Sequence, residues 1–561
     1  MDFRAAAAYA GPLPGSVFTT RNGRTGYYAD PLQPKTGAAI DAILDQADDA
    51  DVDEIDEQAV KKLLLALEKR ITRNAQLRVK YSDRPAKFLE SEVDLDDAVK
   101  ALGLCAAAPE FYGEFARLDG VASVVSLLAH ENADIAGSAI ALLFDLTDAD
   151  DAVGDDAQGG HRALVAALVT CDGLATLAQA LDRFDEAVAE EAQARHHALG
   201  VFEHVVEHDG VVEPACATLG PWLAKRIVAK RGDDAVKLYA AEVLSILCGR
   251  SDACASTLAS PETIDALLWA CAKYKKADPA GPDDEELLEN LFQSLTALLN
   301  GAPQTAVPEF VRAEGVELML RCLSEGRASA APALRVLAAS LEHPREDSTE
   351  EATGAPRRVL AADGMRHLFP ALMGRGAARG TLLGSSERRA KKRRKRRRGD
   401  DQKALDEHVV ACLASLCLYA AHDDAPDQAR PRLVRKFLEG DQEKVKRVLE
   451  RYAFYMREVI LVESSEDPLE TLARALGAGL HALRLCGVLL AFCAVFAPAC
   501  RPMLVEGLGS KGVGELANCV ADLADAVHDG NAAVGGAQVE RARVLRTWAG
   551  AVAALAPEAP S

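Results

Sequence analysis

The sequence has few aromatic residues and no segment with the signals of a β-strand. Trp, Tyr and Phe make up 5% of the 561 residues, whereas hydrophobic residues as a class make up 49%. A chain that is this long and this apolar can bury an extensive core, and it exceeds a single ordinary domain. We therefore expect a folded protein with either several domains or one elongated repeat array.

The sequence also lacks long apolar runs and paired cysteines. Its longest apolar segment, at 487–500, is too short to span a bilayer, and its first residues lack the basic and apolar regions of a signal peptide. The thirteen cysteines include no CxxC pair. Cys486, Cys493 and Cys500 would share one helix face, where a free thiol acts as a small buried hydrophobe. We expect a soluble intracellular protein from a reducing compartment.

Positive charge is scarce, because 64 Lys and Arg stand against 85 Asp and Glu and give a net charge of -21. Such a surface disfavours non-specific binding to nucleic acid or to an anionic membrane, and it suits a basic partner. Acidity that serves solubility alone is the alternative. We expect neither direct nucleic-acid binding nor membrane binding.

One dense basic run interrupts this acidic chain between Arg388 and Arg398, after a glycine-rich stretch. We expect it to be an exposed nuclear localisation signal for an importin-type receptor, with a solvated linker or a nucleic-acid contact as alternatives. The run is also a candidate internal competitor for an acidic surface of the same chain. The signal residues are Arg388, Arg389, Lys391, Lys392, Arg393, Arg394, Lys395, Arg396, Arg397 and Arg398.

From Asp53 onward the pattern is helical, and a repeat emerges. Val60, Leu63, Leu64 and Leu67 recur at the spacing of one helix face. An acidic residue and a glycine then precede an apolar helix four times, which indicates a short helix ending at glycine and a new helix beyond it. These pairs are Asp119-Gly120, Asp172-Gly173, Glu314-Gly315 and Asp363-Gly364.

The spacing of these pairs favours helical repeats of about 40–47 residues that carry insertions. The predicted fold is all-α, an armadillo-like or HEAT-like right-handed superhelical solenoid with a helical N-terminal cap. A coincidental series of amphipathic helices is the alternative. The expected regions are a flexible tail (1–48), the cap (49–115), armadillo-like repeats (116–373), a basic exposed loop (374–404), and C-terminal helical repeats with a cap (405–561).

The segment LEKRITRNAQLRVKYSDRPAKFLESEVDLDDAVKAL, at 67–102, resembles the beta-catenin-like protein 1 family of armadillo-type nuclear proteins of the spliceosome. Further likeness covers nearly the whole chain from Asp53, although each of the other segments alone is ordinary helix sequence. Those segments are WLAKRIVAK at 222–230, KLYAAEVLSIL at 237–247, ENLFQSL at 289–295, EHVVACLASL at 407–416 and RLVRKFLEGDQEKVKRVLE at 432–450. The usual N-terminal extension of the family, with its basic clusters and acidic runs, is missing here.

The resemblance implies a non-enzymatic adaptor in pre-mRNA splicing that binds basic nuclear-localisation-type segments of splicing factors. It implies a nuclear location and no cofactor or metal. Stacked helix pairs offer a long concave surface, whose acidic side chains can hold an extended basic peptide through charge-assisted hydrogen bonds.

The last helix of each repeat faces inward in armadillo proteins generally, so its polar residues are the candidates for peptide binding. Placing the repeats in one phase selects Asp145, Glu203, Glu242 and Asn290. A solvated helix face would give the same pattern. The tryptophan and asparagine pairs of import receptors are absent, which disfavours the import-receptor mechanism. A nuclear transport adaptor for basic cargo is the alternative within the class of binding proteins.

An enzyme is the alternative from another class. His204 to His208 matches H-x-x-E-H, in which two histidines one turn apart could bind zinc and the intervening Glu207 could act as a base. No third ligand follows at a recognisable distance. A polar helix face is therefore the favoured interpretation over a zinc-dependent hydrolase.

Overall fold

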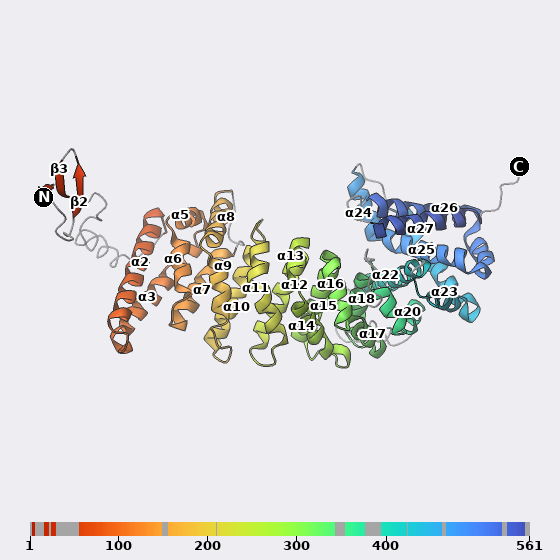
Figure 1. The fold of residues 1–561 in the computed structure, drawn as a ribbon, viewed down its shortest axis with the longest axis horizontal. Coiled ribbons are helices and arrows are strands. Elements are labelled where there is room, and N and C mark those ends of the chain that lie inside the picture. Colours follow the sequence, from red (N-terminus) through yellow and green to blue (C-terminus); the bar gives the residue numbers. More distant parts are fainter. Residues whose placement is uncertain are drawn as a thin grey trace. The chain divides into compact units, whose positions relative to one another are not determined.

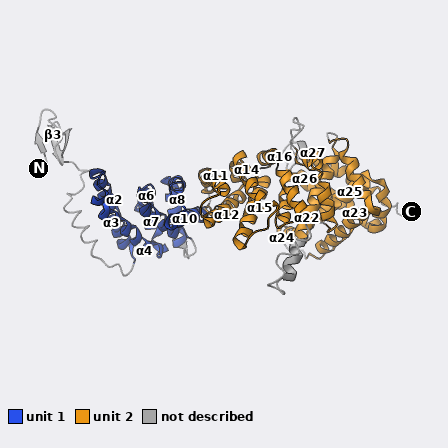
Figure 2. Ribbon diagram, turned by 90° about the horizontal axis from the view of Figure 1, so that it is seen from below, with its two compact units in different colours: residues 1–205 blue, residues 206–561 orange. Residues whose placement is uncertain are grey.

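The computed structural model describes residues 3–5, 16–21, 24–29, 55–148, 155–208, 210–342, 354–375, 394–422, 425–462, 467–529 and 536–555. The chain divides into two compact units, Met1–Val205 and Val206–Ser561 (Figure 2). The helices from α2 to α10 in unit 1, and from α11 to α22 in unit 2, follow one another along the stack in chain order (Figure 1). We describe each unit by itself.

A small antiparallel sheet lies within the segment that we expected to be a flexible tail. It consists of β1 (Phe3–Ala5), β2 (Ser16–Arg21) and β3 (Arg24–Ala29), in the order β1-β3-β2. The expectation of no strands is therefore wrong here. Only Asn22 and Gly23 separate the paired residues Arg21 and Arg24 in sequence, and this dipeptide is a strong hairpin signal.

The helical part of unit 1 begins with an antiparallel pair, α2 (Glu57–Lys80) and α3 (Leu89–Ala101). The Asp56 carboxylate accepts a hydrogen bond from the Ala59 N–H and so caps α2. Where the two helices meet, buried Asn74 donates to the Ser91 hydroxyl at 3.0 Å. Two buried polar groups are thereby satisfied, which fixes the contact between the helices.

Two three-helix repeats follow in unit 1 after the short helix α4 (Gly103–Ala106). We call the three helices of a repeat H1, H2 and H3. The first repeat comprises α5 (Tyr112–Arg117), α6 (Gly120–Leu127) and α7 (Ala133–Thr147). The second comprises α8 (Asp155–Thr170), α9 (Gly173–Leu181) and α10 (Ala189–Val205). Each H3 packs against the next, so that α7 contacts both α3 and α10.

Unit 2 continues the same architecture. Its first repeat comprises α11 (Val212–Val228) and α12 (Asp234–Arg250), and its second comprises α13 (Asp252–Leu258), α14 (Pro261–Cys271) and α15 (Pro282–Gly301). The third repeat comprises α16 (Pro303–Arg312), α17 (Gly315–Glu325) and α18 (Ala330–Glu342). The fourth comprises α19 (Ala355–Ala361), α20 (Met365–Leu372) and α22 (Arg394–Ala421). The C-terminal helices are α23 (Ala429–Ile460), α24 (Pro468–Ala478), α25 (Leu480–Phe496), α26 (Arg501–Asp529) and α27 (Gly536–Ala553). The H3 helices α12, α15, α18 and α22 pack on one another in succession.

The repeated acidic-glycine pairs lie where H1 turns into H2. The acidic residue is in the left-handed region, with φ of 55–59° at Asp119, Asp172, Glu314 and Asp363. A Cβ added to any of the four glycines would lie 2.7–2.9 Å from the carbonyl oxygen five residues earlier. The sequence analysis placed the helix end at the glycine. The structure corrects this, because the acidic residue makes the turn and the glycine allows H2 to approach H1.

An acidic residue suits this position for two reasons. Asp tolerates the left-handed conformation better than most residues, and a negative charge just before a helix N-terminus is favourable. We had expected the long interval between the second and third acidic-glycine pairs to be an insertion, and this expectation is wrong. The interval holds two further repeats, α11–α12 and α13–α15.

The basic segment also departs from expectation. We predicted a loop over 374–404, but the backbone is helical from Arg394, where α22 begins. Arg and Lys are good helix formers, and α22 continues into a buried part at Lys403–Ala421. Residues 388–393, and the side chains of 394–398, lie outside the described part of the chain, so the localisation signal stays a prediction.

The buried part of α22 is the one described helix that is long and apolar enough to cross a membrane by itself. Two bent helix pairs, α8 with α9 and α24 with α25, would pass the same test if each were counted as one span. Within the fold, 67% of the Lys403–Ala421 window is buried, and α22 packs between α18 and α25. Its apolar character therefore has an explanation in the core.

The cysteines are free and mostly buried, as predicted, but α25 ends at Phe496 and Cys500 lies in the 3-10 segment Pro498–Cys500, so it does not share a helix with Cys486 and Cys493. All thirteen are free thiols, and all are buried except the half-buried Cys171.

Candidate peptide-binding surface

The candidate surface of unit 1 consists of the solvent-facing residues of the H3 helices α7 and α10. Helix α7 contains Asp134 and Asp145 and has no Lys or Arg. The one Lys or Arg of α10 is Arg195, which is bonded to the Glu186 carboxylate and the Phe184 carbonyl. The surface is therefore acidic, and its single cation is already neutralised.

The predicted residues Asp145 and Glu203 lie on these neighbouring helices. Asp145 is exposed and Glu203 is half-buried. Partial burial raises the pKa of the Asp145 carboxyl, and His197 opposes part of that rise. Because the Asp145 side chain reaches solvent, its carboxyl group is accessible to a cationic side chain of a ligand.

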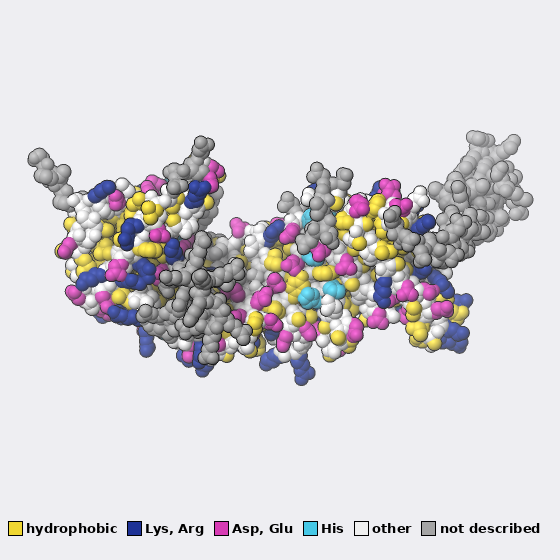
Figure 3. Space-filling model, turned by 180° about the vertical axis from the view of Figure 1, so that it is seen from behind, with side chains coloured by type: hydrophobic (Ala, Val, Ile, Leu, Met, Phe, Trp, Pro, Cys, Tyr) yellow, Lys and Arg dark blue, Asp and Glu magenta, His cyan; other side chains and the backbone are white. Residues whose placement is uncertain are grey.

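An aromatic cluster connects α7 to α10 beside these acids. The Phe144 ring lies 4.8 Å from the His197 ring and 4.9 Å from the His204 ring, measured between centroids. Burial, together with the neighbouring His196, lowers the pKa of His197. Figure 3 shows histidine side chains among Asp and Glu side chains near the middle of that view.

His204 of the H-x-x-E-H motif has a structural role in this cluster. Its Nδ1 lies 3.2 Å from the Thr147 hydroxyl, while the Thr147 carbonyl is 2.9 Å from His161 Nε2. Among the described residues, no three His, Cys, Asp or Glu side chains are grouped so that they could hold a metal ion. His204 therefore joins α10 to α7, and Thr147 in turn joins α7 to α8.

The candidate surface of unit 2 begins on α12 and α15, which carry the predicted residues Glu242 and Asn290. Both residues are half-buried. The Asn290 Nδ2 atom is buried and has no hydrogen-bond partner among the described residues. An unsatisfied buried amide is costly, so the Asn290 side chain would gain a hydrogen bond by turning outward to an acceptor.

Helix α15 is the most acidic H3 helix of unit 2. It contains no Lys or Arg and bears Asp283, Asp284, Glu285, Glu286 and Glu289. Asp284 pairs with Lys273 at 2.7 Å, and Glu289 pairs with Arg335 of α18 at 2.7 Å. The other three carboxylates remain available for a partner, because all three are exposed.

Fewer residues of the candidate surface are exposed to solvent on α18 than on α12 and α15. Every residue of α18 is buried except Ala331, Arg335 and Glu342. Arg541 of α27 donates to the Glu342 carbonyl at 2.8 Å. The C-terminal helix thus reaches the H3 helix of the third repeat of unit 2, and α12 and α15 are the more accessible H3 helices.

Sequence reasoning placed the acidic residues on the correct class of helix but missed two features. It did not find the Phe144 cluster, whose members lie on two different helices. It selected Asn290 by phase alone and could not detect its unpaired amide. Two histidines at the middle and the C-terminal end of α10, His197 and His204, which face a phenylalanine one repeat earlier, were the available signal.

A family model described as catenin-beta-like, Arm-motif containing nuclear, matches residues 38–514. Beta-catenin-like protein 1 of Homo sapiens is 32% identical over 480 residues, which cover 82% of this chain and 79% of that protein. The beta-catenin-like protein 1 homolog of Schizosaccharomyces pombe is 30% identical over 399 residues, which cover 70% of this chain and 63% of that protein.

Among solved structures, an engineered protein aligns with 16% identity and a TM-score of 0.43, over 82% of this chain and 95% of its own. The three-helix repeats and the Arm-motif family agree with the predicted armadillo-like helical solenoid, which is confirmed. The chain belongs to the beta-catenin-like protein 1 family of Arm-motif nuclear proteins.

Proposed function

We propose that this chain is a non-enzymatic nuclear scaffold of the pre-mRNA splicing machinery that binds basic nuclear-localisation-type segments of splicing factors. The observation that carries the proposal is the charge of the H3 helices. Helices α7 and α15 bear only acidic charged residues. A ligand that crosses α7 meets no Lys or Arg of that helix. On α15, Asp284 and Glu289 already pair with Lys273 and Arg335, and the exposed Asp283, Glu285 and Glu286 remain for the ligand.

Two features of these surfaces suit an extended basic peptide. Carboxylates such as Asp145 and Glu242 can form charge-assisted hydrogen bonds with Lys and Arg side chains. The Asn290 amide is buried without a described partner, and if its side chain turns outward it can donate to a peptide carbonyl and so hold the backbone. Charge selects the ligand and the amide fixes its position, which is the division of roles expected in peptide recognition.

The proposal is tested with a defined probe, a fluorescein-labelled peptide that copies residues 385–401 of this chain. Binding is measured by fluorescence anisotropy at two salt concentrations, on a chain whose Arg388–Arg398 run has been replaced by Gly and Ser. We expect Asp145→Lys and Glu242→Lys each to weaken binding several-fold, and more at low salt, where charges are less screened. Asp427→Lys, an exposed change outside the H3 helices, is the matched control.

Equal affinity for all these variants would refute peptide binding at the H3 helices. The same titration on the intact chain tests whether the basic run competes internally, because competition requires tighter binding after the run is replaced.

The splicing role is tested separately, by affinity purification of the tagged full chain from nuclear extract followed by mass spectrometry. We expect spliceosomal proteins in the wild-type sample and their depletion in the Asp145→Lys, Glu242→Lys double variant. Recovery of import receptors and cargo without spliceosomal proteins would favour a transport adaptor instead.

A further inference from the structure

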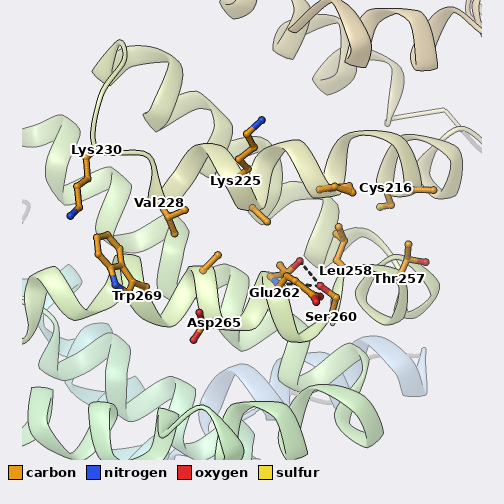
Figure 4. Close-up of a pocket in the computed structure, with 16 residues that line it drawn as sticks. Cys216, Lys225, Val228, Lys230, Thr257, Leu258, Ser260, Glu262, Asp265 and Trp269 are labelled. Atoms are coloured by element: carbon orange, nitrogen blue, oxygen red, sulfur yellow. Dashed lines mark hydrogen bonds between the residues drawn. The ribbon is translucent and has the colours of Figure 1, made fainter. Parts of the chain in front are cut away.

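A groove in unit 2 contains no residue of any H3 helix. It lies between α11 and α14, with the end of α13 beside it, and has a volume of about 900 Å³. Buried Cys216, Gly220 and Ala224 form its floor on α11 and follow one another at intervals of one helical turn. At Gly220 the Leu258 side chain of α13 packs on the floor, since an added Cβ there would lie 2.5 Å from it, and the groove opens beside this contact between α11 and α14 (Figure 4).

An exposed tryptophan marks one end of this groove. Trp269 is 54% exposed, whereas Trp222 and Trp548 are 8% and 2% exposed. The Lys230 ammonium lies 5.6 Å from the centre of the Trp269 ring, and Figure 4 shows the two side chains together at that end. Tryptophan is among the residues that contribute most to protein interfaces, and an exposed indole beside an apolar floor is a suitable anchor.

The two edges of the groove differ in charge. Glu262 and Asp265 are exposed along the α14 edge, and neither forms a hydrogen bond or ion pair through its carboxylate with another described side chain. Lys230 stands at the end of the α11 edge. A ligand that complements these charges therefore carries Lys or Arg residues on the side that faces the α14 edge and none on the side that faces the α11 edge.

The backbone of the groove favours a helical ligand over an extended one. A strand binds by adding to an open sheet edge, whereas both walls here are helices, and Pro221 is the one interior position of α11 that donates no backbone N–H. A row of small residues between two helices instead accepts the ridge of a third helix. From Cys216 to Val228 the floor is on the order of 18 Å long, which corresponds to about 12 helical residues.

We propose that this groove binds an amphipathic helix of a partner protein, with its apolar face on the Cys216–Ala224 floor and Lys or Arg residues beside Glu262 and Asp265. This surface is distinct from the H3 helices and takes a ligand of different form. The chain would then hold two partners at once, a basic peptide and a helix.

The probe is a phage-displayed library of random 16-residue peptides, selected on the full chain and counter-selected against the Trp269→Ala variant. We expect enriched peptides with apolar residues at helical spacing and basic residues along one edge. Synthetic copies should bind Trp269→Ala at least tenfold more weakly than the wild type. They should also bind Asp265→Lys several-fold more weakly, and exchanging the facing basic residue for Glu should restore that binding.

Asp427→Lys serves as the charge control, and Asp145→Lys with Glu242→Lys separates this proposal from the previous one. Unchanged affinity for the latter variants, with loss in Trp269→Ala, supports a second site. Enriched peptides that are uniformly basic or proline-rich, or whose binding ignores Trp269 and Asp265, would overturn the groove proposal and leave the H3 proposal intact.

Discussion

Gly315→Ala should destabilise the protein strongly, because Gly315 lies where H2 comes closest to H1. An added Cβ would lie 2.4 Å from two ring atoms of Phe310 and 2.7 Å from the Phe310 carbonyl oxygen. The Phe310 side chain is fully buried, and its carbonyl belongs to the backbone of α16. Neither group can move without shifting the packing of α16 against α17.

The expected size follows from two opposing effects. Within a helix, Ala is usually more favourable than Gly by about 0.5–1 kcal/mol. Overpacking of a filled core costs about 1–3 kcal/mol and occasionally more. Because the clash involves backbone as well as a buried ring, we expect the free energy of unfolding to fall by about 2–3 kcal/mol.

Gly550 is the matched control, because it lies in helix α27 with nothing within 4 Å of an added Cβ. Gly550→Ala should raise stability by about 0.5–1 kcal/mol. The assay is urea unfolding followed by far-ultraviolet circular dichroism, comparing transition midpoints at equal slope. If the two substitutions shift the midpoint in the same direction, the close approach at this junction does not exist.

The remaining predictions concern charge and local conformation. Glu314→Gly removes a left-handed non-glycine residue and should raise stability by about 1 kcal/mol. His204→Ala should lower stability by about 1 kcal/mol through the loss of its Thr147 contact, and chelators should leave thermal unfolding unchanged. Burial, with nearby Arg335, lowers the pKa of His408 to about 4. Because the unfolded state binds the proton more tightly, the free energy of unfolding should decrease as the pH is lowered from about 6.5 to about 4. His408→Gln should make this pH dependence shallower. Replacing 388–398 with Gly and Ser in a fluorescent fusion should move the protein to the cytoplasm, and an unchanged nuclear signal would contradict the targeting prediction.

The sequence predicted the helical repeats at the four places where an acidic residue followed by glycine joins H1 to H2. Each acidic-glycine pair combines a left-handed turn with a close helix approach, and both demands fall on adjacent residues. The two repeats that escaped detection use other junctions. Helix α14, for example, begins after Ser260, whose hydroxyl accepts from the Thr263 N–H, with Pro261 in the first turn. A search for one signature cannot find a repeat whose turn is built differently.

The candidate site was predictable only in part, because its two components depend on different ranges of interaction. Apolar periodicity fixes which face of α7 is buried, and so Asp145 was placed correctly on the exposed face. The contact of Phe144 with His197 depends on which residues of α7 and α10 meet, and this relation between helices is not encoded in either helix alone. The exposure of Trp269 was likewise not predictable from the sequence, since a lone tryptophan in a helix is usually buried.

The packing of H3 helices also limits how many residues can set the charge of the candidate surface. Within unit 1, α7 packs on α10, and within unit 2, α12, α15, α18 and α22 pack on one another in succession, so only a narrow stripe of such a helix faces solvent. On α18 this leaves Arg335 and Glu342 as the charged residues that are not buried. On α7 the exposed charged residues are Asp134 and Asp145. Because so few carboxylates define each stripe, selectivity for a basic peptide rests on few charges, and one or two reversals are sufficient to reverse the local potential.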